Sequence, residues 1–245
     1  MGAAEGGDLM GFLGDVLAWF TDPAHWSGPD GIPSRTWEHV QLSAFATVIA
    51  AALTLPPALW LGHRRRGGQF VVAVVNIGRA IPSFAIIALF LPFTIRLGLG
   101  LGFWPTFLAL FALAAPPMFT NAYTGISGVD PALVEAARGM GMTEPELLRS
   151  VELPLASPVI LAAVRVAAVQ VVATATLGAI VAWGGLGRYV VDGFSTQDNV
   201  EVFAGGLLVA LLVIGTEVAL SLLERRVVPA GIHTTARAEL EIHAI

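Results

Sequence analysis

Hydrophobic residues in this chain gather into long apolar runs, which are separated by shorter polar or charged stretches. Five of these runs carry almost no charge over about 20 residues, the length that an α-helix needs to cross a hydrocarbon core of ~30 Å. The pattern predicts an all-α fold, a polytopic membrane bundle of five transmembrane helices. The expected spans cover residues 39–61, 70–91, 103–122, 154–182 and 202–223.

Three further segments flank or interrupt these spans. In residues 1–36, apolar side chains between Leu9 and Phe20 recur at three- and four-residue spacing, which is typical of an amphipathic helix. Two placements remain open for this helix, one flat in the membrane interface and one on the protein's own outer surface. The expected membrane domain is residues 37–224, with a long polar loop at residues 123–153 and a C-terminal tail at residues 225–245.

The distribution of arginine predicts the direction of the spans, because short loops that are rich in Lys and Arg stay in the cytoplasm. The densest positive cluster, Arg64-Arg65-Arg66, follows the first span. With that loop inside, eight of the loop and tail arginines lie in the cytoplasm and three lie outside. Residues 1–38 carry six acids and one Arg, which also favours the outside. We therefore expect a multi-pass protein of the plasma membrane, with its N-terminus out and its C-terminus in.

Composition excludes several classes of function. Of the 245 residues, 56% are hydrophobic and 13% are charged, whereas about a quarter are charged in soluble proteins. The chain has no Cys, which removes disulfides, thiolate catalysis and iron–sulfur ligation. All 13 basic residues are Arg, so the chain lacks the Lys of a conventional P-loop ATPase. A net charge of −5 argues against a nucleic-acid partner, and the five histidines show no metal-ligand spacing.

The polar loop between the third and fourth spans carries signals for two short helices. Asp130 is a suitable N-cap and Pro131 a suitable first residue for the first helix, which Gly139 should end. Thr143 and Glu146 have the spacing of a capping box at the start of the second. These signals alone leave two interpretations open, a docking element and a solvated re-entry loop.

The residues of this loop resemble the EAA loop of ABC importer permeases. Glu135-Ala136-Ala137 is followed, after three residues, by Gly141 and, after nine more, by Val151-Glu152-Leu153-Pro154. Only Val151 departs from that pattern, where the family has Ile. The resemblance implies a type I ABC importer permease fold, in which this loop is the coupling helix that seats in a cleft of the ATPase subunit. The implied coupling residues are Glu135, Ala136, Ala137, Gly141, Leu153 and Pro154.

Other stretches resemble the permeases of osmoprotectant importers, which carry glycine betaine, carnitine, choline and proline. They are Asn76-Ile77 with Ile81-Pro82-Ser83-Phe84, the run from Ala137 to Thr143, and Gly184-Gly185-Leu186-Gly187. The resemblance covers roughly Trp37 to Glu224. One departure is Thr120-Asn121-Ala122, which stands where such permeases commonly have Arg-Asn-Thr.

The resemblance also implies the partners. ATP and Mg would bind to separate ATPase subunits, which supply two ATPase domains to the complex. This chain would hold no cofactor or metal of its own. A second permease copy or a paralogous permease would complete the pore, and an extracytoplasmic solute-binding protein would deliver the solute.

Polar or kinked positions in the second to fourth spans are candidates for the translocation path. Ser and Thr at such positions can equally hydrogen-bond to their own helix backbone. The candidates are Asn76, Pro82, Ser83, Asn121, Gln170 and Thr174.

Three ionisable residues fall within the predicted spans, namely Arg79, Arg165 and Glu217. Buried charges are costly in a bilayer, so we expect Glu217 to neutralise Arg165 or Arg79. A proton relay is the weaker alternative, because a relay needs several titratable groups in series.

Other functions remain as alternatives to an osmoprotectant permease. A permease for another small solute, such as an amino acid or a phosphonate, fits the same fold. A membrane-embedded enzyme needs paired acids or a nucleophile with its base inside the spans, and Glu217 alone does not supply them. A scaffold protein leaves the EAA spacing unexplained. We therefore expect a transport subunit rather than an enzyme.

Overall fold

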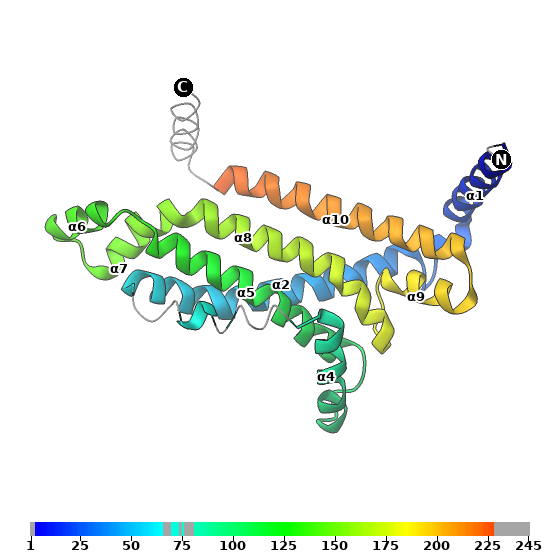
Figure 1. The fold of residues 1–245 in the computed structure, drawn as a ribbon, viewed down its shortest axis with the longest axis horizontal. Helices are drawn as coiled ribbons and strands as arrows, with labels where there is room; N and C mark the ends of the chain where they lie inside the picture. The colour runs from blue at the N-terminus through cyan, green and yellow to red at the C-terminus, as the bar shows by residue number, and fades with distance from the viewer. Residues whose placement is uncertain (1–2, 66–69, 74, 76–80, 228–245) are drawn as a thin grey trace. The chain divides into compact units, whose positions relative to one another are not determined.

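The computed structural model describes residues 3–65, 70–73, 75 and 81–227, and every regular element within them is helical. Figure 1 shows the helices in chain order, from blue to red. Short 3₁₀ segments follow α1 and α8, at Pro23–Trp26 and Ala175–Val181, and a π-helical turn, Leu148–Glu152, precedes α8. The α-helices are α1 (Ala3–Thr21), α2 (Ile32–Arg64), α4 (Ser83–Arg96), α5 (Phe103–Ser127), α6 (Pro131–Gly139), α7 (Glu144–Leu147), α8 (Leu153–Thr174), α9 (Gly187–Thr196) and α10 (Asn199–Val227).

Four helical stretches of the described chain are long and apolar enough to cross a membrane. They correspond to the first, third, fourth and fifth predicted spans, and each is longer than its prediction. They run over Ile32–Arg64, Phe103–Ser127, Glu144–Val181 and Asn199–Arg226.

The span predicted over residues 70–91 is not one uninterrupted helix. Residues 70–73 and 75 are helical, but Ile81 and Pro82 are not, and α4 begins only at Ser83. Pro82 has an extended backbone (φ −57°, ψ 135°), and a proline disfavours helix in the residue before it. The helix α4 continues through Pro92 to Arg96, beyond residue 91, where the predicted span ends.

The fourth predicted span changes its helix type before it ends. The α-helical part, α8, stops at Thr174, and the chain continues as a 3₁₀ helix to Val181. Ala182 then takes a left-handed conformation (φ 67°), which turns the chain toward the glycine-rich stretch before α9.

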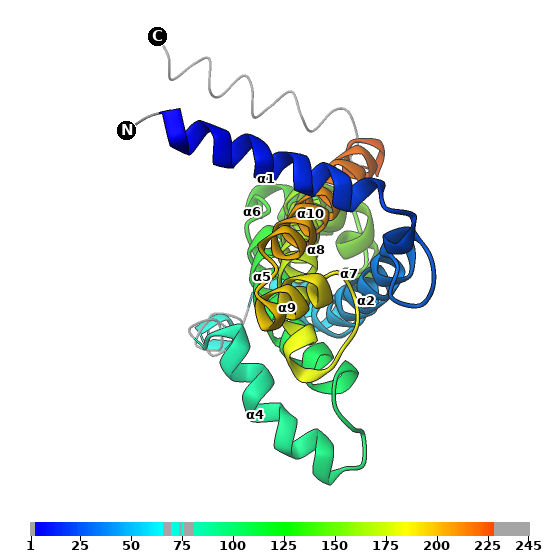
Figure 2. The same cartoon turned by 90° about the vertical axis from the view of Figure 1, so that its right-hand side faces the viewer.

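The chain divides into two compact units, and α2, α5, α8 and α10 contribute residues to both. The first unit comprises residues 1–48, 81–113 and 168–216. Its buried cluster joins α1, α2, α9 and the first part of α10, and Figure 2 shows α9 beside this part of α10. The cluster consists of Trp19, Ile32, Leu186, Tyr189 and Ala204.

The helix α1 packs only in part against its unit. Val16 and Trp19 are buried, and the ring of Phe12 meets that of Phe203 edge to face. Leu13 and Leu17 of the predicted apolar face remain exposed. The amphipathic helix therefore has one side on the protein and an apolar side without cover in the described chain.

A polar contact in the first unit requires a glycine. The backbone N–H of Gly185 donates to Glu38 Oε2 (2.8 Å), and the Arg35 guanidinium holds the same oxygen (2.9 Å). A Cβ at Gly184 would lie 2.0 Å from Glu38 Oε2, so any other residue there would displace the Glu38 carboxylate from this contact. The glycine-rich stretch thus acts as a close-packed turn against the start of α2.

The second unit comprises residues 49–80, 114–167 and 217–245. Its described residues lie mainly in α6 and α7, in parts of α2, α5, α8 and α10, and at positions 70–73 and 75. A Cβ at Gly62 would lie 2.9 Å from the backbone oxygen of Tyr123, so α2 and α5 cross closely there. The buried cluster is Ala58, Phe119, Ala122, Tyr123, Ile126, Ala156 and Ile160.

Candidate functional site

The first helix of the polar loop, α6, forms where its sequence signals place it. Asp130 Oδ1 accepts a hydrogen bond from the backbone N–H of Ala132 (2.8 Å), and Pro131 is the first helical residue. The helix ends at Gly139, and Gly141 follows with φ +90°, a value that favours glycine. A small apolar cluster underlies the helix, formed by Val129, Val134, Ala137 and Leu147.

The second helix of the polar loop, α7, is short and leads directly into the next span. Glu146 Oε2 accepts hydrogen bonds from the backbone N–H (2.8 Å) and the hydroxyl (2.7 Å) of Thr143, which fixes the start of α7. The α-helix ends at Leu147, and the π-helical turn Leu148–Glu152 carries the chain into α8. The chain therefore runs from α7 into α8 along a continuous helical backbone.

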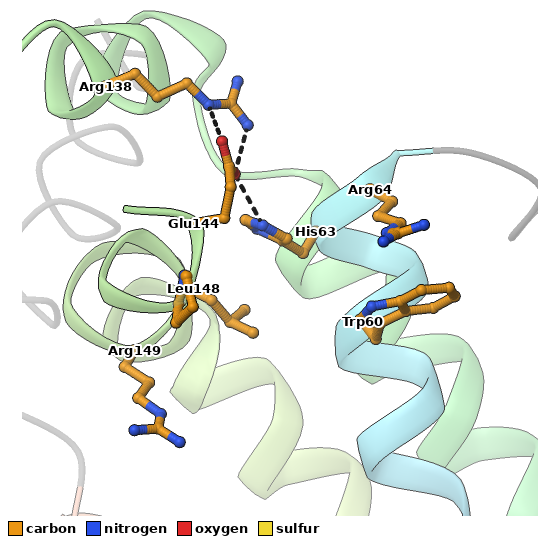
Figure 3. A pocket seen from close by; sticks show the side chains of 8 residues that line it. Trp60, His63, Arg64, Arg138, Glu144, Leu148 and Arg149 are labelled. Carbon is orange, nitrogen blue, oxygen red and sulfur yellow. Dashed lines mark hydrogen bonds and ion pairs between the residues drawn. The ribbon is translucent and has the colours of Figure 1, made fainter. Parts of the chain in front are cut away.

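A histidine at the C-terminal end of α2 joins both parts of this segment (Figure 3). His63 Nδ1 lies 2.6 Å from Glu152 Oε2, and His63 Nε2 lies 3.0 Å from Glu144 Oε2. The Glu152 side chain is 0% exposed. A buried carboxylate needs such a partner, because an unpaired charge is expensive to desolvate.

Glu144 also receives a two-point contact from α6. Arg138 Nε donates to Glu144 Oε1 and Arg138 Nη2 donates to Glu144 Oε2, both at 2.9 Å. The hydrogen bond from Arg138 holds the pKa of Glu144 below its ordinary value, and the same bond raises the pKa of Arg138. The backbone N–H of Thr143 likewise lowers the pKa of Glu146. These carboxylates are therefore ionised at neutral pH.

Sequence reasoning missed His63, Glu144 and Glu152. Glu152 occupies the variable position of the EAA pattern, between Val151 and Leu153. A charged residue among apolar neighbours at the start of a span was the signal that it needs a partner. His63 lies 89 residues from Glu152 in the sequence, so no local pattern identifies it as that partner.

The six residues that the resemblance assigns to coupling do not share one environment. Glu135 and Ala136 are exposed on α6, and Gly141 is exposed in the turn that follows. Ala137 is buried in the apolar cluster of the segment, while Leu153 and Pro154 are half-buried at the start of α8. Glu135 forms no ion pair within the described part of the chain.

The exposed side of α6 carries two large apolar side chains. Leu133 is 50% exposed and Met140 is 75% exposed, and Glu135 lies between them in the sequence. An apolar surface with an acid on a short helix is suited to docking against another protein.

A cavity of about 610 Å³ lies beside the end of α2 and the polar segment of residues 131–152, which we call the coupling segment after the role that the resemblance implies (Figure 3). The Arg64 guanidinium stacks over the Trp60 ring at 4.0 Å from the ring centroid. The lining residues are Trp60, His63, Arg64, Arg138, Glu144, Pro145, Leu148 and Arg149.

The translocation-path candidates divide between the two units. Asn121 lines a second cavity of about 390 Å³, between α5 and α8, and its amide donates to the Pro117 carbonyl (2.8 Å). Asn76 lies outside the described residues. The first unit holds the remaining candidates, with Pro82 and Gln170 exposed and Ser83 and Thr174 half-buried.

Arg165 on α8 contacts two acids on α10. Its Nη1 lies 2.8 Å from Glu217 Oε1, and its Nε lies 3.2 Å from Glu224 Oε2. We predicted a contact with Glu217 but not one with Glu224. The two acids are seven residues apart, which places them on one face of the helix. Arg79, the other cation considered, lies outside the described residues. In the described chain, no group of three or more His, Asp or Glu side chains could hold a metal ion.

Helices of spanning length, with a polar helical segment tied to the end of one of them, are typical of a polytopic membrane protein. Residues 43–229 match the family model described as "Binding-protein-dependent transport system inner membrane component", and the chain belongs to this family. It is therefore a multi-pass membrane transport subunit without catalytic activity, and the ATPase is a separate subunit.

Curated relatives are similar over most of their length. The choline transport system permease protein OpuBB of Bacillus subtilis is 36% identical, over 80% of this chain and 88% of the relative. The carnitine transport permease protein OpuCB of Listeria monocytogenes is 36% identical, over 89% and 95%. The osmoprotectant import permease protein OsmW of Salmonella typhimurium is 32% identical, over 89% and 99%.

Solved structures show the same fold. An inward-facing MetNI methionine ABC transporter matches with a TM-score of 0.70 and 24% identity, over 85% of this chain and 100% of that chain. An amino acid ABC transporter matches with a TM-score of 0.62 and 21% identity, over 80% and 94%. The fold is therefore that of an ABC importer permease.

Proposed function

We propose that this chain is the membrane-spanning subunit of an ATP-driven importer for osmoprotectants of the glycine betaine, choline, carnitine and proline class. The observation that carries the substrate class is the similarity to permeases named for choline, carnitine and osmoprotectant import, each matched over more than four fifths of its length. The ABC importer fold and the coupling segment support the mode of action.

The exposed face of α6 is the docking surface for the ATPase in this proposal. Leu133 and Met140 would enter an apolar cleft of the ATPase, and Glu135 would meet a basic residue at its rim. ATP and Mg would bind only to the ATPase subunits. Their closure would move α6 and α7 together, because Arg138 and Glu144 clamp the two helices and His63 ties them to α2.

The proposed topology has five spans, with the N-terminus outside and the C-terminus in the cytoplasm. Residues 70–75 and α4 together would form the second span, with its interruption at Pro82. The arginine distribution supports this direction. A second copy or a paralogous permease would complete the pore, and a solute-binding protein would dock on the outside, as the name of the family suggests.

The proposed solute path includes Asn121, whose cavity is otherwise lined by Pro and small or branched apolar side chains. Such a surface offers weak contacts to a methylated ammonium group, which suits a path that must also release its solute. Asn76, Pro82, Ser83, Gln170 and Thr174 remain candidates for other parts of the path.

Uptake by the reconstituted complex tests the proposal. The chain, its ATPase, its permease partner and its binding protein would be placed in vesicles that contain ATP. We expect labelled choline or glycine betaine to accumulate inside, with ATP required and unlabelled carnitine competing. Accumulation that only an amino acid or a phosphonate inhibits would instead assign the chain to an importer of another small solute.

A further inference from the structure

The helix α1 has two apolar sides, and the described chain covers only one of them. Val16 and Trp19 are buried against the first unit. Leu9, Leu13 and Leu17 repeat at four-residue spacing, which places them along one side of the helix, and they are 61%, 46% and 66% exposed. We call these three residues the leucine row. A continuous apolar row of this kind is suited to contact with an apolar partner.

The opposite side of α1 is suited to water. Successive residues of an α-helix are ~100° apart, so Asp15, two residues from both Leu13 and Leu17, points away from the leucine row. Asp15 and Ala18 are both exposed. The helix therefore separates an apolar side from a polar one, with the protein at its flank.

The helix α1 lies crosswise to a membrane-length helix of its own unit. The first part of α10 runs lengthwise in Figure 1 and is seen nearly end-on in Figure 2, where α1 extends lengthwise. The two helices meet near the start of α10, where the rings of Phe12 and Phe203 pack edge to face with their centroids 5.4 Å apart. A helix that lies crosswise at the end of a membrane-spanning helix runs parallel to the membrane surface.

The leucine row adjoins an exposed apolar face of α10. Phe203, Leu207 and Leu211 follow one another at four-residue spacing, and all three are exposed in the described chain. Phe12, which contacts Phe203, comes three residues after Leu9 and so neighbours it on the surface of α1. Hydrocarbon that covers this face of α10 would therefore also reach the leucine row.

Exposed tryptophans mark this end of the first unit. Trp26 lies in the 3₁₀ segment after α1, Trp37 lies near the start of α2, and Trp104 lies at the start of α5. The starts of α2 and α5 both approach the chain at residues 182–185 closely, so they lie at the same end of the unit. Tryptophan is enriched where hydrocarbon meets water, which places α1 at that boundary.

We infer that α1 lies in the membrane interface, with the leucine row in the hydrocarbon of a lipid surface and Asp15 toward water. The helix contains acidic residues but no Lys or Arg. Burial of its leucines, rather than attraction to anionic headgroups, therefore holds it there. The placement does not depend on the solute or on the ATPase, and the proposed topology adds only that the leaflet is the outer one.

A protein partner fits the leucine row less well than a lipid surface does. Specific protein interfaces bury about 800 Å² on each partner, and three partly exposed leucines offer only a fraction of that area. The row also continues into the apolar face of a membrane-length helix, which a bilayer covers without any further recognition.

Spin labels on single cysteines test the placement, because the chain has no Cys of its own. L13C and L17C report on the leucine row, and D15C and A18C are the matched controls at exposed positions on the other side. Each labelled chain is assembled into its importer complex in phosphatidylcholine vesicles. Oxygen, which concentrates in hydrocarbon, should relax the labels of L13C and L17C more strongly than a water-soluble nickel complex does. The order should reverse for D15C and A18C, and added phosphatidylglycerol should not change the pattern.

Three results would overturn the inference. Equal access of the nickel complex to all four labels would place α1 in water. Protection of L13C and L17C that appears only with the solute-binding protein would make that protein the cover, and magnetic coupling between labels of two copies would make it a second copy. Choline uptake by the same vesicles separates the two proposals, because the expected pattern without uptake contradicts the proposed function alone.

Discussion

The Glu152 carboxylate is fully buried between the coupling segment and α2, and His63 is its partner in the described chain. A buried charge without a partner destabilises a fold more than the intact pair stabilises it. His63 therefore has two roles in one side chain, since one ring nitrogen contacts Glu152 and the other contacts Glu144. Small changes at this residue should affect both folding and coupling.

Replacement of His63 with leucine should destabilise the protein by about 3–5 kcal/mol, because the Glu152 carboxylate stays buried without a partner. Thermal unfolding of the purified chain in detergent measures this loss. The double variant H63L/E152M removes both groups, and we expect it to recover most of the stability. Equal instability of the single and double variants would show that the pair itself is not the cause.

Gly141 takes a backbone conformation that side chains avoid, whereas nearby Gly139 does not. A Cβ at either position would have no atom within 4 Å, so the two differ in backbone strain alone. We expect G141A to strain the turn between α6 and α7 by about 1–2 kcal/mol and to lower the stimulation of ATPase activity by substrate. G139A is the control and should retain stimulation. A similar loss in both variants would place the effect elsewhere than in the turn conformation.

At the scale of helices, the ion pairs of Arg165 connect α8, which the coupling segment leads into, with α10. The two acids on α10 share one arginine, so loss of Glu217 alone leaves Glu224 as a second contact. Loss of Arg165 instead leaves two acids without a partner. The three residues should therefore differ in their sensitivity to substitution.

We expect R165A to reduce the folded yield and transport more than E217A does, since Glu224 still contacts Arg165 in the latter. The exchanged variant R165E/E217R should restore part of what R165E loses. Folded yield by size-exclusion chromatography and uptake in vesicles are the measurements. If R165E/E217R recovers nothing and E217A behaves as the wild type does, the pair of Arg165 and Glu217 has no part in assembly.

Helices of this chain could be predicted from the sequence where the signal is local. The apolar runs predicted four of the membrane-length helices, and Asp130 with Pro131 predicted the start of α6. Pro82 was among the polar or kinked positions, but the predicted span continued across it because the residues on both sides are apolar. The contact of His63 with Glu152 could not be predicted, because it depends on how α2 and the start of α8 pack rather than on any sequence spacing.

For the whole molecule, the low charge of the chain has a physical reason, because a different subunit supplies the energy for transport. A subunit that takes its energy from a separate ATPase needs apolar helices and one docking segment, and it needs no phosphate-binding Lys. Arg138, Glu144, Glu152 and His63 pair with one another, which ties the segment to the end of α2. In the proposed function, this segment faces the cytoplasm.

The absence of cysteine allows a direct test of this topology, because each introduced cysteine is the only thiol in the chain. Ser195 on α9 and Ser150 in the coupling segment are both exposed, and neither belongs to a residue pair discussed above. We expect a membrane-impermeant maleimide to label S195C in intact cells and to label S150C only after the membrane is opened. A permeant maleimide should label both, which controls for access to the thiol. Labelling in the reverse order would invert the proposed orientation and would place the coupling segment where no ATPase can reach it.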